Sequence, residues 1–277
     1  MKTGRVTLIA FALLFLTAAL PPTSPAGGKG KASPGLFETG ADLLYDLDAK
    51  GREITRLPDS VEIEIGKGVD QKIRAEKRLC RDEGRLALAG EVFARLKKGA
   101  TRKIPYRLTV LDDATVNAYA APGGFTYVTT GLLNYIKDDR DQLALVLGHE
   151  ITHNEKYHVI GRIQYAAIAQ GLIGVNTAKF VDIAYGLLTI PFEKRDEFEA
   201  DDGGAVLSDR AGYAVSRGIL FFDRLAQEEE KQGESTRSGK DPAGNAFKDI
   251  AYFFRSHPYS RERAARLREL GKKKGFK

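Results

Sequence analysis

Two histidines and a glutamate within residues 149–153 have the types and the spacing that metal-dependent hydrolysis requires. The segment reads HEITH, and residues four apart lie about one turn from each other on the same side of an α-helix. Both imidazoles can therefore bind one metal ion, and the HExxH spacing is typical of a zinc site. Glu150 directly follows the first of them, so it lies beside the metal, where it can take a proton from water. We predict that His149 and His153 bind Zn²⁺, one ion per chain, and that Glu150 is the catalytic base.

A catalytic zinc site usually has three protein ligands, and the acidic segment 193–208 offers the third. Glu197 and Asp201 are four residues apart and share one face of the helix expected there, whereas Glu199 points elsewhere. We predict that Glu197 binds the metal and that Asp201 accepts a hydrogen bond from the outer nitrogen of a zinc-bound histidine. In isolation the segment would be interpreted as a solvated acidic helix face. Its partnership with HExxH favours the ligand hypothesis.

The elements that must position these groups follow from hydrophobic periodicity. Asp138 or Asp139 is the expected N-cap of the HExxH helix, in which Leu143, Leu147 and Ile151 form an apolar row. The other expected elements are a short helix near residue 43, a strand over 61–65, one long helix over 69–98, strands over 106–111 and 125–130, helices over 131–136, 193–208 and 212–225, two buried or cleft-covering helices within 165–190, and a mobile loop over 227–244.

A Pro-Gly-Gly turn at 122–124 connects two β-type segments. The preceding residues, 117–121, and the following run, 125–130, predict a hairpin in a small antiparallel sheet. The strand before the turn suits an extended peptide added along its edge. We therefore predict that this edge strand lines the active-site cleft and that its residues bind substrate through Asn117, Ala118, Tyr119 and Ala120.

Length and composition bound the organisation of the chain. Its 277 residues, 43% hydrophobic and 29% charged, fit one globular core and exclude a disordered chain or a multispan membrane protein. Lys2 and Arg5 precede an apolar run over 6–20 and small residues at 24–26, which predicts a signal peptide over 1–26. A flexible leader over 27–35 and a single domain over 36–277 follow. The expected location is the periplasm, and the alternative is an uncleaved N-terminal anchor facing it.

The distribution of charge limits the kinds of partner that the chain can bind, and the cysteine content limits its disulfides. The net charge is +6, and the segment 261–277 alone carries eight basic and two acidic residues. This concentration in one basic C-terminal helix argues against an extended nucleic-acid surface. Peripheral membrane contact through 165–190 or the basic tail remains an alternative. Cys80 is the only cysteine, so no internal disulfide can form.

A series of short motifs occurs in a fixed order from about residue 70 to 268. These motifs are Asn117-Ala118, Pro122-Gly123-Gly124, Gly131-Leu132-Leu133, His149 to His153, Glu197 to Asp201, Ala211-Gly212-Tyr213, and His257-Pro258 with Arg263. In them the chain resembles the HtpX and CAAX-prenyl-protease family of zinc metallopeptidases (gluzincins), in its soluble, exported bacterial branch. The family often has Ser-Arg before the ligand glutamate, where this chain has Glu193-Lys194 followed by Arg195. That departure leaves the role of this arginine open.

The resemblance implies an α+β fold, mainly helical and zincin-type, with Glu197 as ligand and Glu150 as base. His257 is then a candidate catalytic residue that stabilises the oxyanion, with two alternatives: it blocks the zinc at rest, or it is structural and fixed by Pro258. Arg263 is expected to contact substrate or to position its own segment. His158 is expected to pack or form a hydrogen bond at the end of the helix.

The predicted function is that of a zinc metalloendopeptidase. Main-chain pairing with an edge strand needs an unfolded substrate and reads little of its sequence. The expected substrates are therefore unfolded or misassembled cell-envelope proteins, in proteolytic quality control. The alternative is a zinc-binding periplasmic chaperone or assembly factor with little or no turnover, although such a binder has no need of Glu150.

Overall fold

The computed structural model describes residues 56–172, 176–237, 253, 257–258 and 260–276. The predicted signal peptide, the leader and the helix near residue 43 lie outside these residues. The described helices and strands, in chain order, are α3 (Asp59–Glu76), α4 (Glu83–Leu96), β1 (Arg107–Leu111), β2 (Ala118–Ala121), β3 (Phe125–Thr129), α5 (Thr130–Tyr135), α6 (Arg140–Glu155), α7 (His158–Ala169), α8 (Thr177–Leu187), α9 (Lys194–Arg210), α10 (Val215–Gly218), α11 (Leu220–Arg237) and α13 (Ser260–Lys274).

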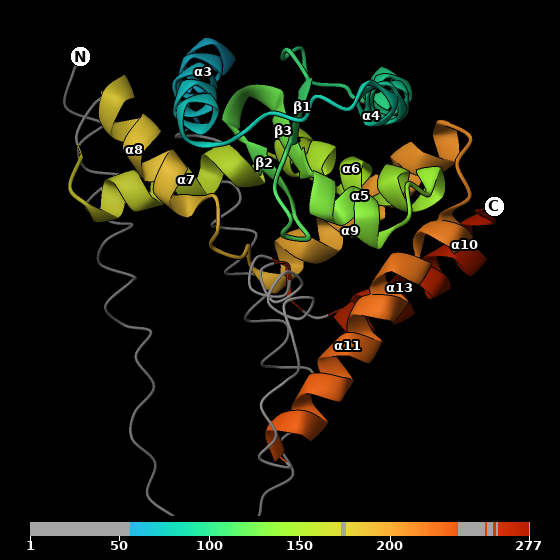
Figure 1. Ribbon diagram of the computed structural model, residues 1–277. Helices are drawn as coiled ribbons and strands as arrows, with labels where there is room; N and C mark the ends of the chain where they lie inside the picture. Colours follow the sequence, from blue (N-terminus) through green and yellow to red (C-terminus); the bar gives the residue numbers. More distant parts are fainter. Residues whose placement is uncertain (1–55, 173–175, 238–252, 254–256, 259, 277) are drawn as a thin grey trace, which may run out of the picture. The chain divides into compact units, whose positions relative to one another are not determined.

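A three-stranded sheet lies at the centre of these helices, in the order β1-β3-β2 (Figure 1). The β2–β3 pair is the antiparallel hairpin predicted around the Pro-Gly-Gly turn, with Ala118 opposite Val128. The β1–β3 pair, however, is parallel. The sheet is thus mixed, and the prediction of a purely antiparallel sheet was wrong. The α+β class is confirmed.

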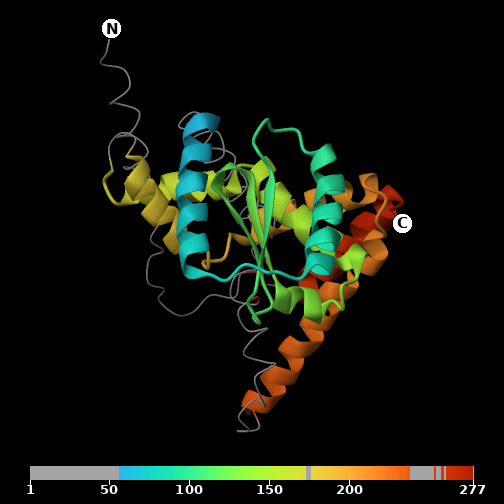
Figure 2. The same ribbon diagram turned by 45° about the horizontal axis from the view of Figure 1, so that its top comes forward.

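The core consists of two clusters, one on each face of the sheet. Along β3 the side chains alternate, so Phe125 and Tyr127 join a cluster with α3, α7 and α8, whereas Val128 joins a larger cluster with α4, α6 and α11. Figure 2 shows α3 and α4 on opposite sides of the sheet, consistent with this division. The sheet thereby lies between the two helical layers that carry most of the buried apolar surface.

Helix α6 carries the HExxH segment and begins at its predicted cap. The Asp139 carboxylate accepts hydrogen bonds from the backbone N–H groups of Asp141 and Gln142. Every residue from 142 to 154 is buried, including the predicted row Leu143, Leu147 and Ile151. Because α6 is enclosed on all sides, its polar side chains need partners within the protein.

The Pro-Gly-Gly turn is held by polar groups from two helices. Gly123 and Gly124 have φ angles of +74° and +84°, a region that glycine tolerates without strain. The Gly123 N–H donates to Glu62 Oε1 over 2.9 Å, and the Gly124 N–H donates to Asn154 Oδ1 over 3.2 Å. The turn therefore fixes the position of β2 relative to both α3 and α6.

Two predictions in the first described part of the chain were wrong. Residues 61–65 belong to α3 and do not form a strand, and the long helix expected over 69–98 is divided between α3 and α4. In the intervening link, the Cys80 N–H donates to the Val110 carbonyl, and Leu79 forms a bridge to Leu111. The link pairs with β1, and this pairing replaces the helical hydrogen bonds that continuity would have required.

The second half follows the predictions with three changes. The single helix expected over 212–225 is divided into α10 and α11, the second of which begins at Leu220. The two helices expected within 165–190 are α7 and α8, although α7 begins earlier, at His158. Helix α11 continues to Arg237, so the described part of the predicted mobile loop is helical. The basic C-terminal helix is α13, which packs beside α11 (Figure 1). Within the described ranges, no helix combines the length and the apolar character that crossing a membrane requires.

Candidate metal centre

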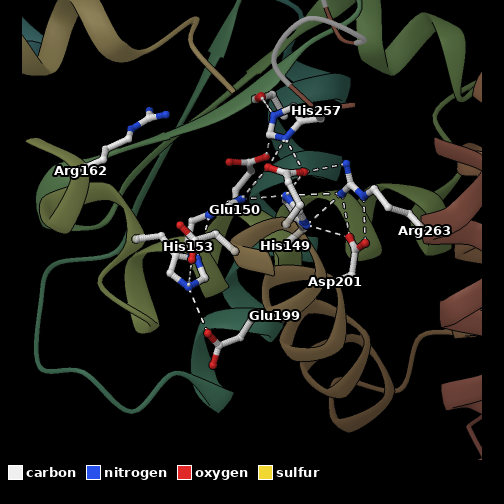
Figure 3. A network of polar contacts seen from close by, with 12 residues as sticks. His149, Glu150, His153, Arg162, Glu199, Asp201, His257 and Arg263 are labelled. Carbon is white, nitrogen blue, oxygen red and sulfur yellow. Dashed lines mark hydrogen bonds and ion pairs between the residues drawn. The ribbon is translucent and has the colours of Figure 1, made fainter. Parts of the chain in front are cut away.

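The three predicted ligands meet where α6 packs against α9. His149 and His153 come from α6 and Glu197 from α9, and none of the three is more than 3% exposed. His149 Nε2 and His153 Nε2 are 2.9 Å apart. The Glu197 carboxylate oxygens lie 3.6 Å from the first of these nitrogens and 3.5 Å from the second. The three side chains thus direct ligand atoms at one point. Figure 3 shows two of them, His149 and His153.

This arrangement fits one metal ion. Bonds of about 2.0–2.1 Å in a tetrahedral site place the ligand atoms about 3.4 Å apart, close to the separations found here. Two imidazole nitrogens facing each other at 2.9 Å need something between them, either a shared proton or a metal ion. Two histidines and a carboxylate are also a common ligand set of catalytic metals. The residues therefore fit the predicted metal site.

Burial and neighbouring charges hold the ligands in the forms that bind metal. Burial, followed by the proximity of His149, lowers the pKa of His153 well below its usual value. Burial alone would raise the pKa of Glu197, but Arg263, His257 and His149 outweigh it and hold this pKa well below its usual value. A neutral imidazole and an ionised carboxylate are the ligand forms that a metal ion needs.

Asp201 lies where it was predicted, behind His149. Its Oδ1 is 2.9 Å from His149 Nδ1, the nitrogen remote from the ligand cluster. Burial would raise the pKa of Asp201, but Arg263 and the bond to His149 outweigh it and keep the pKa below its usual value. An ionised Asp201 can accept a hydrogen bond from the His149 Nδ1–H, which leaves Nε2 free for the metal.

Arg263 lies beneath the ligands and not on an open surface. Its side chain is 1% exposed, with Nε 2.8 Å and Nη2 2.7 Å from the two Asp201 oxygens. Its Nη1 lies 2.8 Å from Glu197 Oε2. The substrate contact predicted for Arg263 does not fit this buried position. The guanidinium instead orients one ligand and the partner of another.

Glu150 lies beside the ligand cluster with one carboxylate oxygen unengaged. The residue is 1% exposed, and Oε1 is 3.5 Å from His257 Nε2. Among the described residues, Oε2 is buried and has no hydrogen-bond partner. An unpartnered buried carboxylate oxygen is costly to maintain, and a base that accepts a proton from water needs such an oxygen.

His257 completes a buried group of four possible ligands. One ligand atom from each of His149, His153, Glu197 and His257 lies within 4.8 Å of the others. His257 Nδ1 is 3.3 Å from both Glu197 oxygens, and Nε2 is 3.2 Å from the Ala118 carbonyl oxygen of β2. Burial would lower the pKa of His257, but Glu197 and Glu150 outweigh it and raise this pKa.

The predicted substrate-binding residues lie on or directly before β2. The Asn117 carbonyl accepts a hydrogen bond from Thr129 N–H, so Asn117 and Tyr119 pair with β3. By strand alternation, the backbone groups of Ala118 and Ala120 point away from β3. Ala118 and Ala120 are nevertheless buried, at 0% and 2% exposure. The structure places β2 next to the site through His257, and whether β2 lines an open cleft remains a prediction.

The structure also brings in residues that sequence reasoning did not assign to the site. His158 forms the hydrogen bond expected at the end of the helix, but its partner is the ligand His153, at 3.1 Å between the two Nδ1 atoms. On its other side, His158 Nε2 is 3.2 Å from Glu199 Oε2, and this bond is the largest cause that lowers the pKa of Glu199 to about 2. The position of His158, nine residues after His149, was the available signal.

Nothing in the sequence indicated that Phe192 and Arg162 lie at the site. The Phe192 ring stacks on the His153 ring with centroids 3.8 Å apart, and the Arg162 guanidinium lies 3.8 Å from the Phe192 centroid. Arg162 Nη1 also donates to the Ile190 carbonyl over 2.7 Å. Burial lowers the pKa of Arg162 to about 10. Together these contacts hold the link between α8 and α9 over one face of a ligand.

Comparison with known proteins agrees with this geometry. Residues 81–271 match the sequence profile of peptidase family M48. The mitochondrial metalloendopeptidase OMA1 of Arabidopsis thaliana is 29% identical over 136 residues, which cover 45% of this chain and 26% of that protein. Its counterpart in Schizosaccharomyces pombe is 26% identical over 175 residues, covering 60% and 47%. The chain thus spans less than half the length of either protein.

The metalloprotease LoiP of Escherichia coli matches along almost its whole length. It is 24% identical over 273 residues, which cover 95% of this chain and 98% of that protein. The match to the family profile covers more than half of the present chain and includes all three ligand positions. By its sequence profile, and in agreement with its buried His-His-Glu centre, the chain belongs to peptidase family M48.

Proposed function

We propose that this protein is a zinc metalloendopeptidase that hydrolyses internal peptide bonds of unfolded polypeptides. One observation carries the proposal: the three converging ligand atoms of His149, His153 and Glu197 lie beside a buried Glu150 oxygen that has no partner among the described residues. A binding protein would have no use for that oxygen, whereas hydrolysis needs a base at this place.

Each residue of the site has a role in this mechanism. A zinc ion held by the two histidines and Glu197 would supply Lewis-acid activation of water and of the scissile carbonyl. Glu150 accepts the proton of the attacking water at Oε2 and delivers it to the leaving amine. Asp201 and Arg263 keep His149 and Glu197 in their binding orientation. His257 lies within reach of the reacting groups and donates an N–H to the developing oxyanion.

We propose that substrate pairs with the edge of β2. The backbone groups of Ala118 and Ala120 point away from β3, and a peptide that paired there would displace His257 Nε2 from the Ala118 carbonyl and so free this N–H for the oxyanion. An extended peptide that paired there would pass close to Glu150. Since folded proteins seldom expose extended backbone, this mode selects unfolded substrates and depends little on their sequence.

The proposal also includes the cellular location of the protein and the class of its substrates. The predicted signal peptide over 1–26 supports an exported, periplasmic protein, with misassembled cell-envelope proteins as substrates. The match to LoiP over nearly the full chain is consistent with a bacterial protease of similar size. The membrane contact predicted for 165–190 or the basic tail gains no support from the described helices, and we do not include it.

Cleavage of one substrate protein in its unfolded and folded forms tests this function. The purified full chain is incubated with a permanently unfolded protein and with the folded form of that protein, before and after metal removal by a chelator. We expect internal cleavage of the unfolded form only, its loss on metal removal and its return with added zinc. Binding of the unfolded protein without cleavage in the zinc-loaded state would instead favour the chaperone alternative. Cleavage unaffected by metal removal would contradict both.

A further inference from the structure

The outer nitrogen of His153 faces a second histidine. His153 Nε2 is directed at the other ligands, so its Nδ1 lies on the remote side of the ring, 3.1 Å from His158 Nδ1. His158 Nε2 is in turn 3.2 Å from Glu199 Oε2, and Lys156 Nζ is 2.7 Å from Glu199 Oε1. Figure 3 shows Glu199, the carboxylate at the outer end of this series, below His153 and away from His257.

The metal site fixes the direction of every hydrogen bond in this series. A neutral imidazole that binds metal through Nε2 carries its proton on Nδ1. His153 therefore donates from Nδ1, and His158 must accept at its own Nδ1. The proton of a neutral His158 is then on Nε2, from which it donates to the Glu199 carboxylate. One tautomer of His158 satisfies both contacts. The other would place two donors opposite each other at His153 and two acceptors opposite each other at Glu199.

We propose that His158 is a positioning residue for the metal centre: it fixes the tautomer and the ring orientation of His153 and is itself held by Glu199. The inference rests on the proposed function, since it assumes that His153 binds metal. In this proposal the two histidine ligands are oriented by different kinds of hydrogen-bond partner. The outer nitrogen of His149 contacts the Asp201 carboxylate directly, whereas the outer nitrogen of His153 is connected to a carboxylate through a second imidazole.

The backbone is shaped to bring His158 to this place. Helix α6 ends at Glu155, and Tyr157 adopts a left-handed conformation with φ +61°, unusual for a residue with a side chain. Helix α7 then begins at His158, which is only 7% exposed. The break between the two helices thus turns His158 back towards His153, which a continuous helix would not do, because residues five apart lie on different faces.

Two neighbours complete the restraint on the His153 ring. Phe192 stacks on its face with an interplanar angle of 18°, and His158 holds its edge. Glu199 is two residues after the ligand Glu197, so α9 supplies a ligand from one face and the end of this series from another. A side chain that only filled space would need neither the Nδ1 contact nor the carboxylate.

Substitution by two residues of nearly equal shape tests the proposal. In His158→Asn the amide oxygen takes the place of the accepting nitrogen, whereas in His158→Leu the same volume carries no acceptor. Zinc affinity of the full chain is measured by competition with a chelator. We expect the leucine variant to bind zinc about 10–100-fold more weakly than wild type, the usual effect of losing an outer partner. The asparagine variant should stay within about threefold.

A spectroscopic readout and a milder variant accompany the affinity measurements. The Nδ1–H proton of His153, observed by NMR in the zinc-loaded ¹⁵N-labelled protein, should exchange with water faster in His158→Leu and not in His158→Asn. If His158→Leu fails to fold, Glu199→Met tests the same series from its half-exposed end, with Asp202→Met on the same helix as control. We expect weaker zinc binding for Glu199→Met and wild-type binding for Asp202→Met.

The outcomes separate the two proposals. Wild-type affinity in both His158 variants, or an equal loss in both, would overturn the positioning role, because neither result depends on the hydrogen bond. Equal affinities of Glu199→Met and Asp202→Met would do the same for the role of Glu199. A wild-type protein that binds no zinc would instead overturn the proposed function, and the inference with it.

Discussion

Arg263 holds the centre together without being one of the metal ligands. Its guanidinium lies between two buried carboxylates, Asp201 and Glu197, and all three side chains are at most 1% exposed. Those carboxylates raise the pKa of Arg263 against the effect of burial. The two negative charges can remain buried and ionised because this one positive charge neutralises part of them.

Replacing Arg263 should therefore cost more than an ordinary buried side chain. We expect Arg263→Met to lower the free energy of unfolding by about 3–5 kcal/mol, because it leaves two buried carboxylates without their cation. Urea unfolding of the metal-free protein measures this loss. Arg266→Met is the matched control, since Arg266 pairs with Asp202 on the surface one turn later and should contribute less than about 1 kcal/mol. Equal losses in the two variants would contradict the assigned role of Arg263.

At the scale of single elements, α6 was the most predictable part of the molecule. Its cap and its apolar row are local signals, and both were predicted correctly. The HExxH spacing of its two candidate ligands is a local signal as well. The first half of helix α3 was missed because Glu62 alternates with Val61 and Ile63 as it would in a half-exposed strand. In the structure Glu62 is fully buried and pairs with Arg102, forty residues away, a contact that no local pattern contains.

The break between α3 and α4 was equally hidden. No glycine or proline occurs between Lys77 and Asp82, and the link is stabilised by pairing with β1. The parallel β1–β3 pairing likewise depends on where the chain returns, not on the composition of either strand. Local signals thus predicted which side chains of α6 and α9 come together, whereas non-local pairing decided the sheet.

The cap of α6 gives a prediction about stability and pH. Burial would raise the pKa of Asp139, but the hydrogen bonds from Arg217 and the Gln142 N–H outweigh it, so the pKa lies below its usual value. Since the folded-state pKa is lowered, the stabilisation by the ionised cap is complete above the unfolded-state pKa of about 3.9. It is lost as the pH falls through the lower folded-state value.

We therefore expect Asp139→Ala to lower the free energy of unfolding of the metal-free protein by about 1 kcal/mol at pH 7. The difference from wild type should shrink as the pH falls below about 4, where the carboxylate takes up its proton. Urea unfolding followed by circular dichroism at pH 7 and at pH 3 measures both values. Asp139→Asn keeps a capping side chain and is the control. A difference that grows on acidification would show that the sign is wrong.

At the scale of the whole molecule, the site depends on how closely α6 and α9 approach each other. The centre combines groups from α6, α9, α13 and β2, which span residues 118–263 of the chain. The two ligand helices come into backbone contact at Gly148 and Gly204. A Cβ atom placed on Gly204 would lie 2.6 Å from His149 N, and one on Gly148 would lie 2.8 Å from the Gly204 carbonyl oxygen.

We expect Gly204→Ala to force these helices apart. The overpacking should lower the free energy of unfolding by about 1–3 kcal/mol. Zinc affinity should fall as well, because Glu197 lies two turns away on the displaced helix. Gly90→Ala is the control, since a Cβ atom there meets nothing within 4 Å on the exposed side of α4. The free energy of unfolding of that variant should rise by about 0.5–1 kcal/mol, and its zinc affinity should stay unchanged. Unchanged zinc binding in Gly204→Ala would contradict the importance of this crossing.

The role of Glu150 as the base is tested most directly by comparing the wild-type protein with Glu150→Gln. Zinc content and cleavage of a permanently unfolded protein are measured on the same samples. We expect one zinc ion per chain in both proteins, cleavage by wild type, and a cleavage rate at least about 100-fold lower in the variant, because only the base has been removed. Cleavage by Glu150→Gln at the wild-type rate would contradict the central claim. So would a wild-type protein that carries its full zinc complement and cleaves nothing.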